Sequence, residues 1–406
     1  TYRNGTVHLR RYWEPRFCPD ENLSLQEAAD RIEAAFEDSV KVHRISDVEV
    51  GCFLSSGVDS SWAASYFSGQ KAFTVGFGEA GNYNEIDWAA KEAEEKKLQH
   101  TARLISPEEF FEVLPEVLYY MDQPLADPAC VALYFVSELA SRQVKVVLSG
   151  EGADELFGGY RIYHMPDSNF AYQKIVPAWL RRILGSGAER LPDLPGRDFL
   201  IRAGKPLEET FIGNASMFSL REKRKILRNP DLARDPCRIC RPYYRKTAGL
   251  DPVTRMQYLD LHLWMVGDIL LKADRMSMAN SLELRVPFLD PEVFRAAAVI
   301  PKKWKVTGET TKYAMRTAAE RHLPRAAARK PKLGFPVPIR VWLRAEKYYR
   351  AVRKEFSDPE AGRFFRREES LGLLERHYRG REDCSRKIWT VYMFLLWYRT
   401  CFLVNR

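Results

Sequence analysis

Two acidic, glycine-bearing segments follow directly on apolar runs, and their residue types suit phosphate and metal chemistry. In the first, residues 54–61 read LSSGVDSS and follow the apolar run 50–54. A small-residue turn between a strand and a helix points several backbone N–H groups at one spot, with the positive end of the helix behind them. A phosphate group fits such a spot. The segment lacks the G-x-x-x-x-G-K-[ST] pattern of a Walker loop, and an ordinary serine-rich turn is the alternative interpretation.

The second segment, residues 148–160, reads LSGEGADELFGGY and follows the apolar run 144–148. Glycines flank Glu151, so a ligand can approach the backbone closely there. Glu151 and Asp154 share a face if a helix begins at this point, and the adjacent Glu155 adds a third acid. Three acids in five residues repel one another unless a cation or a substrate amine lies among them. Solvated acids at a helix start are the alternative, but the glycines do not favour a helix.

Together the two segments resemble the synthetase domain of glutamine-dependent asparagine synthetases. The first is close to S-G-G-x-D-S, the pyrophosphate loop of enzymes that split ATP into AMP and pyrophosphate, with Ser56 in place of the first glycine. Two more stretches carry the resemblance: residues 268–290 (DILLKADRMSMANSLELRVPFLD), and residues 311–316 (TKYAMR) followed by 330–338 (KPKLGFPVP). All four occur in the family's order, and they cover almost the whole chain.

The resemblance implies a nucleotide site. ATP and Mg²⁺ are the expected ligands, with adenosine beside Leu54, Val75, Ser149 and Gly150. The pyrophosphate is expected on the backbone and hydroxyls of the first loop, which comprises Ser55, Ser56, Gly57, Asp59, Ser60 and Ser61. Asp59 cannot usefully touch a bare polyphosphate and makes sense as a Mg²⁺ ligand.

The resemblance also implies roles for side chains outside the first loop. Asp154 is the metal partner of Asp59, and Lys312 stabilises charge at the α-phosphate and on the leaving pyrophosphate. Lys330 and Lys332 are weaker candidates for phosphate contact. Glu151 matches the glutamate needed for the adenylate step and for handling ammonia. Arg285 and Asp274 either order the cleft or reach the substrate, or they form a buried ion pair.

The expected reaction is ATP-dependent synthesis of asparagine from aspartate through β-aspartyl-AMP, with release of AMP and pyrophosphate. A carboxylate is a poor acylating agent, so the site must spread phosphoryl charge and exclude water from the incoming amine. Three alternatives stay open: an intramolecular amide-forming relative (a β-lactam synthetase or lasso-peptide cyclase), a pyrophosphate-loop enzyme acting on tRNA, and an inactive nucleotide-binding subunit. The sequence shows no added RNA-binding module for the second of these.

Strand and helix patterns alternate through the first part of the chain. Strands are predicted over 48–54, 71–77, 100–104 and 144–148, and helices over 25–42, 60–67, 84–98, 107–120 and 131–142. This alternation predicts an α/β fold, a parallel sheet with helices on both faces, and ligands beyond the carboxyl ends of the strands. Strand signals fade after about residue 165, where helices are predicted over 253–279, 291–299, 312–321 and 388–402. The expected division is a linker remnant (1–20), a pyrophosphate-loop core (21–165) and a helical extension (166–406).

Bulk properties exclude some classes of protein. The 406 residues are 46% hydrophobic, and no apolar run is long enough to span a bilayer. The net charge of +9 suits an anionic ligand such as ATP, and also RNA. Seven scattered cysteines and no export signal predict reduced thiols in the cytoplasm. The pair Cys237 and Cys240 lacks the further ligands that a zinc site needs.

The expected partners follow from the resemblance. The chain begins at Thr1 and lacks the cysteine that opens a glutaminase domain. Free ammonia, or ammonia from a missing glutaminase domain or partner, is therefore the expected nitrogen donor. No nucleic acid or membrane partner is expected, and a homodimer is compatible with the resemblance.

Overall fold

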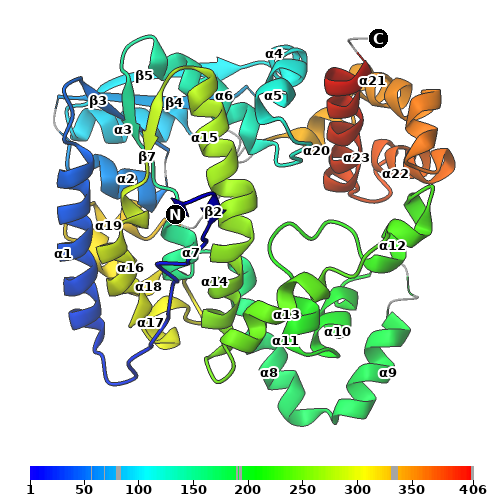
Figure 1. Ribbon diagram of the computed structural model, residues 1–406, viewed down its shortest axis with the longest axis horizontal. Helices are drawn as coiled ribbons and strands as arrows, with labels where there is room; N and C mark the ends of the chain where they lie inside the picture. Colours follow the sequence, from blue (N-terminus) through cyan, green and yellow to red (C-terminus); the bar gives the residue numbers. More distant parts are fainter. Residues whose placement is uncertain are drawn as a thin grey trace.

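The molecule, which we describe from a computed structural model, contains a five-stranded parallel sheet, whose strands lie in the upper left of Figure 1. The strands lie in the order β5-β4-β3-β6-β7, and every neighbouring pair is parallel. Their bounds are β3 (Val50–Phe53), β4 (Lys71–Phe77), β5 (Gln99–Ile105), β6 (Val146–Leu148) and β7 (Glu283–Arg285). The structure describes residues 1–55, 57–67, 69–78, 84–188, 191, 194–330 and 337–403.

Helices make up most of the remaining described chain. The α-helices are α1 (Leu25–His43), α2 (Val58–Ala64), α3 (Ile86–Glu95), α4 (Pro107–Glu112), α5 (Leu114–Met121), α6 (Ala129–Ser141), α7 (Ala153–Phe157), α8 (Met165–Ile175), α9 (Ala178–Ala188), α10 (Arg197–Ala203), α11 (Leu207–Thr210), α12 (Leu220–Ile226), α13 (Cys237–Lys246), α14 (Pro252–His262), α15 (Leu270–Ala279), α16 (Pro291–Ala298), α17 (Lys302–Lys305), α18 (Tyr313–Ala319), α19 (Arg325–Ala328), α20 (Ile339–Trp342), α21 (Glu346–Ser357), α22 (Arg367–Tyr378) and α23 (Ser385–Tyr398). Short 3₁₀ or π-helical turns are η1 (Arg161–His164), η2 (Pro230–Leu232), η3 (Met265–Ile269), η4 (Pro287–Leu289), η5 (Pro359–Arg363) and η6 (Arg399–Leu403).

Two hydrophobic cores cover the two faces of the sheet. Phe73 and Phe77 of β4 lie in one core, together with residues of α5, α6 and α23. Ala72 of β4 and Cys52 of β3 lie in the other, together with residues of α1, α2 and α16. Successive strand residues point to opposite faces, so a strand buried on both sides needs helices above and below. The predicted α/β fold is therefore confirmed.

Two helices predicted as continuous are each divided in the structure, one at a proline and one at a π-helical turn. The single helix predicted over 107–120 is two helices, α4 and α5, and Pro115 stands in the first turn of α5. Proline has no N–H to donate to the preceding turn, so the helical bonding is interrupted there. The helix predicted over 253–279 is likewise divided into α14, the π-helical η3 and α15.

The strand β7 was not predicted. It is only three residues long and shows no clear alternation of apolar and polar residues, so its sequence gives no strand signal. It pairs with β6, with Leu284 opposite Val147. The sheet therefore includes a strand from the segment predicted to be a helical extension. The domain division at residues 20 and 165 stays a prediction.

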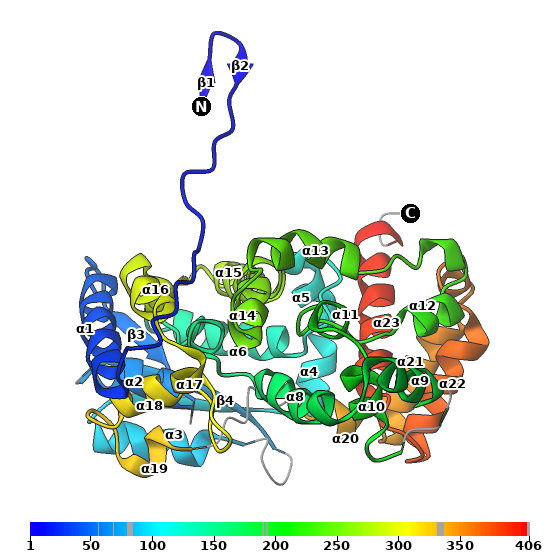
Figure 2. The same cartoon turned by 90° about the horizontal axis from the view of Figure 1, so that it is seen from below.

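The amino-terminal segment extends away from the rest of the molecule. Residues 2–7 form a small antiparallel hairpin, β1 (Tyr2–Arg3) and β2 (Thr6–Val7), which Figure 2 shows projecting from the remaining fold. Leu9 and Tyr12 are almost fully exposed. The segment is tied down near Glu14, which accepts a hydrogen bond from Tyr258 at 2.9 Å and pairs with Lys246.

Candidate functional site

A cavity of about 620 Å³ lies at the carboxyl ends of β3 and β6 and beside the middle of β4. Its wall includes most of the described residues to which the sequence assigned a nucleotide, metal or catalytic role. These residues are Leu54, Ser55, Gly57, Asp59, Ser60, Val75, Ser149, Gly150, Glu151, Asp154 and Lys312. Ser56 lies outside the described residues. The carboxyl ends of parallel strands meet at one edge of a sheet, which explains why distant segments converge here.

Hydroxyl groups hold the first loop in shape. The backbone N–H of Ser55 donates to Ser60 Oγ at 3.1 Å, and the two serine hydroxyls lie 2.8 Å apart. Ser60 Oγ also reaches the carbonyl oxygens of Ser55 and Gly57, at 3.1 and 3.2 Å. Ser61 behaves differently: its hydroxyl donates to Glu92 Oε2 at 2.6 Å, and it is not among the lining residues of the cavity.

The first and second loops are in direct backbone contact at Gly150. A Cβ atom at this position would lie 2.9 Å from the backbone nitrogen of Ser60 and 3.0 Å from Cβ of Asp59. The backbone of the second loop is fixed from the other side, because Ser149 N–H donates to the carbonyl oxygen of Arg285 at 2.9 Å. Only a glycine allows the two loops to approach this closely.

Lys312 joins the two predicted metal ligands. Its Nζ lies 2.6 Å from both carboxylate oxygens of Asp59 and 2.7 Å from Oδ1 of Asp154. The Lys312 side chain is 1% exposed, against 20% for Asp59 and 17% for Asp154. Burial alone would lower the pKa of Lys312, but Asp154 and Asp59 raise it above the ordinary lysine value. The ammonium therefore stays charged and neutralises two carboxylates that would otherwise repel.

The backbone of Lys312 is in the left-handed region, with φ +55°, immediately before α18. A lysine in this region is conformationally strained. Such strain persists only where the surrounding structure over-determines the conformation, and the two ion pairs of Lys312 contribute to that. The predicted helix over 312–321 is confirmed as α18, with Lys312 just outside it.

Gly159 is the position where added bulk would disturb this ion-pair cluster most directly. A Cβ atom at Gly159 would overlap Oδ1 of Asp154 and Cε of Lys312. We expect Gly159→Ala to lower the free energy of unfolding by about 1–3 kcal/mol, the usual range for overpacking. Urea unfolding followed by circular dichroism measures this change.

Gly187→Ala is the matched control, because a Cβ there meets nothing within 4 Å and the residue lies in α9. Replacing a helical glycine with alanine stabilises a helix by about 0.5–1 kcal/mol. Equal midpoints for Gly159→Ala and the unmodified chain would show that the cluster around Lys312 is looser than described.

Glu151 lies in the cavity wall with one oxygen unsatisfied. Its Oε2 is buried and, within the described part of the chain, has no hydrogen-bond partner. Burial raises the pKa of Glu151 to about 7, partly opposed by the charge of Lys272. A carboxyl group whose pKa is near neutrality can exchange a proton at physiological pH, as a general acid or base must.

A second buried cluster, which was not predicted, lies beside Glu151. Lys272 Nζ is 2.5 Å from Asp127 Oδ2 and 2.7 Å from Asp268 Oδ1, and the lysine side chain is 6% exposed. Asp268 and Lys272 are four residues apart, a spacing that indicates a pair on one helix face. Asp127 is 145 residues away from Lys272 in the chain, and no pattern in the sequence connects them.

Two residues assigned to the cleft lie elsewhere. Arg285 pairs with Glu283 at 2.6 Å and donates to the carbonyl oxygens of His43 and Ile45, each at 2.8 Å. It lines a surface depression near residues 45–48 instead of the nucleotide cavity. Asp274 is exposed. Arg285 and Asp274 therefore form no buried ion pair with each other, and neither lines the nucleotide cavity; the expectation that they order the cleft stays a prediction.

The basic residues near residue 330 are partly described. Lys330 lines the cavity, and its ammonium lies 4.5 Å from the ring centre of Trp88. Lys332 lies outside the described residues. Arg316 also lines the cavity and donates to the backbone carbonyls of Thr311, Ala328 and Lys330, at 2.6–2.9 Å. Arg316 was not assigned a role from the sequence.

The donor set fits Mg²⁺ on chemical grounds. Mg²⁺ in nucleotide sites is bound through one or two carboxylates together with substrate phosphates and water. Asp59 and Asp154 supply two carboxylates close enough to share one ammonium. No group of three or more His, Cys, Asp or Glu side chains suited to a metal occurs among the described residues, so a metal here would rely on the substrate for further ligands.

The structure also bears on the state of the cysteines and on membrane-spanning helices. All seven cysteines are free thiols, including Cys237 and Cys240. In the part of the chain that the structure describes, no helix has the length and apolar character needed to cross a membrane.

Comparison with known proteins identifies relatives along the whole chain. The family model described as asparagine synthase matches residues 31–399. Asparagine synthetase [glutamine-hydrolyzing] 1 of Bacillus subtilis is 42% identical over 406 residues, which are 97% of this chain and 63% of the relative. A Mycobacterium bovis protein with a provisional asparagine synthetase (glutamine-hydrolysing) assignment is 45% identical over 399 residues, 96% of this chain and 61% of the relative.

A more distant relative is asparagine synthetase [glutamine-hydrolyzing] 3 of Bacillus subtilis, 27% identical over 355 residues, with 83% of this chain and 52% of the relative covered. The chain thus spans less than two thirds of the length of these curated relatives.

Proposed function

The chain belongs to the asparagine synthase family, and on that premise we propose that it converts aspartate to asparagine at the expense of ATP. The proposed route forms β-aspartyl-AMP and pyrophosphate, and ammonia then displaces AMP. The observation that carries the proposal is the convergence of Asp59, Asp154 and Lys312 beside Glu151 in one cavity.

The chain's own residues have distinct proposed roles in the first half-reaction. The first loop and Lys312 bind the triphosphate, and Leu54, Val75, Ser149 and Gly150 surround adenosine. Asp59 and Asp154 would hold Mg²⁺, which neutralises phosphate charge when bound. Lys312 is a preorganised cation in a buried position, where a charge stabilises a developing anion more strongly than it does in water.

Glu151 is the proposed proton acceptor in the second half-reaction. Ammonia is mostly protonated near neutral pH, and only its neutral form has a free electron pair. A carboxylate with a pKa near 7 and an unsatisfied oxygen can take a proton from the incoming ammonium.

One assay tests the proposal as a whole. The purified chain is incubated with ATP, Mg²⁺, ammonium and L-aspartate, and pyrophosphate, AMP and asparagine are measured together. We expect all three to appear in equal amounts and to require aspartate. Pyrophosphate release that does not depend on aspartate would contradict the substrate assignment, and the absence of any release would indicate a nucleotide-binding subunit without activity.

The proposed partners and location follow from the same premise. We propose that ammonia reaches the site from solution or from a glutaminase domain or partner, and that the protein acts in the cytoplasm. A homodimer and the domain division 1–20, 21–165 and 166–406 are further proposals. Size-exclusion chromatography with light scattering tests the assembly.

A further inference from the structure

Large apolar side chains are concentrated in one part of the molecular surface. Helices α8 and α9 meet at the lower edge of the molecule in Figure 1, and we call residues 165–188, which form them and their connection, the α8–α9 corner. No other described stretch of equal length exposes as many large apolar side chains as the corner and the segment after it, which expose Phe170, Ile175, Trp179, Ile183, Leu184, Leu191 and Leu194. Such a concentration of exposed apolar surface marks a site of interaction.

Helix α9 carries its large apolar side chains on its outward face. The inner face consists of small residues: Gly185 and Ala188 are buried, and a Cβ atom at Gly185 would lie 3.1 Å from the carbonyl oxygen of Leu200 on α10. Trp179 and Ile183 are four residues apart, so they share one side of the helix, and they are 66% and 61% exposed. A helix on the surface of a globular protein normally turns such side chains toward the core. The outward apolar face of α9 is therefore available to a surface outside the chain.

The free charges of the corner are positive. Lys174 of α8 and Arg182 of α9 are exposed, and neither forms an ion pair with another described residue. The ammonium of Lys174 lies 4.5 Å from the ring centre of Phe170. Asp167 and Asp198, the acids of α8 and α10, are each already engaged in an ion pair. The corner therefore combines exposed cations with exposed apolar side chains, and the described part of α8, α9 and α10 has no free carboxylate beside them.

This combination distinguishes between the possible occupants of the corner. A symmetric contact with a second copy of the chain would bring the same cations face to face, and like charges repel. An anionic lipid bilayer instead supplies negative headgroups for the cations and an apolar layer beneath them for the apolar side chains. Tryptophan is enriched at the headgroup level of bilayers. The sequence has no apolar run long enough to span a bilayer, but a helix that lies on the surface needs none.

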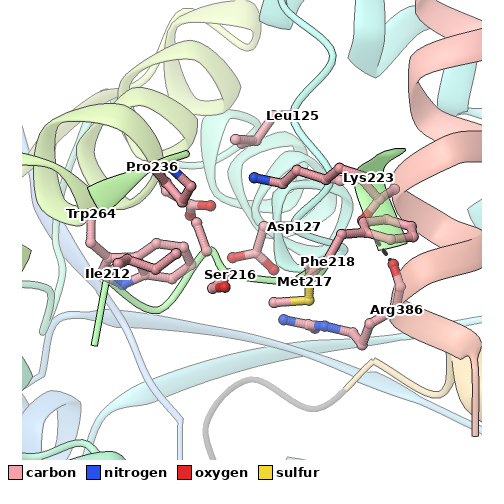
Figure 3. Close-up of a pocket in the computed structure, with 14 residues that line it drawn as sticks. Leu125, Asp127, Ile212, Ser216, Met217, Phe218, Lys223, Pro236, Trp264 and Arg386 are labelled. Atoms are coloured by element: carbon pink, nitrogen blue, oxygen red, sulfur yellow. Dashed lines mark hydrogen bonds between the residues drawn. The ribbon is translucent and has the colours of Figure 1, made fainter. Parts of the chain in front are cut away.

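We infer that the α8–α9 corner binds the surface of an anionic lipid membrane. Ile175, Trp179 and Ile183 insert at the level of the headgroups, and the two free cations contact lipid phosphates. Among the described residues, those of the corner line neither the nucleotide cavity nor the smaller chamber shown in Figure 3. The contact can therefore form without filling either cavity. The cytoplasmic leaflet of a membrane carries anionic lipids, which agrees with the proposed location of the protein.

Sedimentation of the full chain with lipid vesicles tests the inference. We expect the chain to bind vesicles made of equal amounts of phosphatidylcholine and phosphatidylglycerol. Binding to vesicles of phosphatidylcholine alone should be about 10-fold weaker or more, because these vesicles lack the net negative charge that attracts Lys174 and Arg182. Added salt should weaken binding to the mixed vesicles, since it screens this attraction. Equal binding to the two kinds of vesicle, or binding to neither, would overturn the inference.

Two double variants separate the apolar and the electrostatic contributions. Trp179→Ser combined with Ile183→Ser should weaken binding about 10-fold or more, because two large apolar side chains no longer leave water. Lys174→Gln combined with Arg182→Gln should weaken binding to the mixed vesicles about 10-fold and reduce its dependence on salt. All four side chains are exposed, so the urea unfolding midpoints should not change. Ile45→Ser is the matched control, with unchanged binding: Ile45 is 73% exposed and follows α1, which lies on the left of Figure 1, away from the corner.

Other occupants of the corner would give different results. If it joined two copies of the chain, light scattering would show a dimer that the double serine variant dissociates, and vesicles would not be bound. If it received an acidic protein, polyglutamate would bind in place of vesicles. Vesicle binding that both double variants retain would locate the membrane contact elsewhere, and each of these three results would overturn the inference. The measurement uses no substrate, so its outcome does not depend on whether the chain forms asparagine.

Discussion

Replacing Lys312 with alanine is expected to reduce aspartate-dependent pyrophosphate release about 10³-fold. Removal of one preorganised charge or donor at a developing anion typically reduces the rate by two to three orders of magnitude. Lys312 is also the cation that separates two carboxylates, with Nζ at 2.6 and 2.7 Å from them. Release of pyrophosphate, measured with a coupled phosphate assay, gives the rate. A Lys312→Ala variant with wild-type release would show that the cavity is not the catalytic site.

The same substitution should also destabilise the fold, by about 3 kcal/mol, because Asp59 and Asp154 lose their common counter-charge. The pKa of Lys312 is raised above the ordinary lysine value. Its contribution to stability is therefore fully present below about pH 10 and is lost only as the pH rises through the higher folded value. The stability difference between the variant and the unmodified chain should be the same at pH 7 and pH 9 in urea unfolding.

Lys305 provides a matched control for a buried lysine. It is 1% exposed and donates to Gln257 Oε1 at 2.9 Å, but it does not line the nucleotide cavity. Lys305→Met should therefore alter the unfolding midpoint while leaving pyrophosphate release within a few-fold of the unmodified rate. Parallel losses of activity in the two lysine variants would indicate that both act through folding alone.

Glu151→Gln is expected to reduce asparagine formation by about 10²–10⁴-fold, the usual contribution of a positioned acid or base. In the unmodified chain the rate of amide formation at saturating ATP should rise with pH through about 7, where Glu151 loses its proton. In the variant the rate should instead follow the fraction of neutral ammonia, which keeps rising with pH, and show no change of slope near pH 7. Asparagine measured by chromatography over pH 5.5–8.5 tests both statements, and an unchanged pH profile in the variant would exclude Glu151 as the base.

Glu151→Gln is expected to reduce activity but to raise the free energy of unfolding at high pH. The folded pKa of Glu151 is raised to about 7 from an ordinary 4.5, chiefly by burial. The folded state therefore holds its proton more tightly than the unfolded state, and ionisation destabilises the protein as the pH rises from 4.5 to 7. The variant should gain up to about 3 kcal/mol over the unmodified chain at pH 8 and almost nothing at pH 4.5.

Glu92→Gln is the control for this stability effect. Burial raises the pKa of Glu92, which accepts a hydrogen bond from Ser61 and is not in the cavity wall. It should share the direction of the stability change without loss of asparagine formation. A gain in stability that is confined to Glu151→Gln would point to a property of the cavity beyond burial.

The sequence predicted those parts of the site that depend on local pattern. Asp59 and Glu151 each follow an apolar strand, and the rule for parallel sheets places both at one edge, as the structure does. Lys312 was assigned to the same site only because of the resemblance to the family. The position of Arg285 could not be inferred, because the short strand β7 that carries it was not recognised.

Other parts of the site depend on contacts between distant segments. Asp127 lies in a loop and meets Lys272 across 145 residues. Arg386 is the second residue of α23 and lines the nucleotide cavity. A periodic pattern reports which face of one element is buried, but not which two elements share a cavity. The four-residue spacing of Asp268 and Lys272 predicts that the two side chains lie on one face of a helix. It does not predict that this face borders a cavity.

The late position of β7 in the chain has a consequence for synthesis on the ribosome. Strand β6 ends at Leu148, but its neighbour β7 ends at Arg285, about 140 residues later. At roughly 5–20 residues per second, translation leaves the edge of β6 without its partner for roughly 7–28 s. An uncovered edge of Val146, Val147 and Leu148 can pair with other nascent chains. Efficient production of this protein should therefore depend on chaperones that bind short apolar segments during translation.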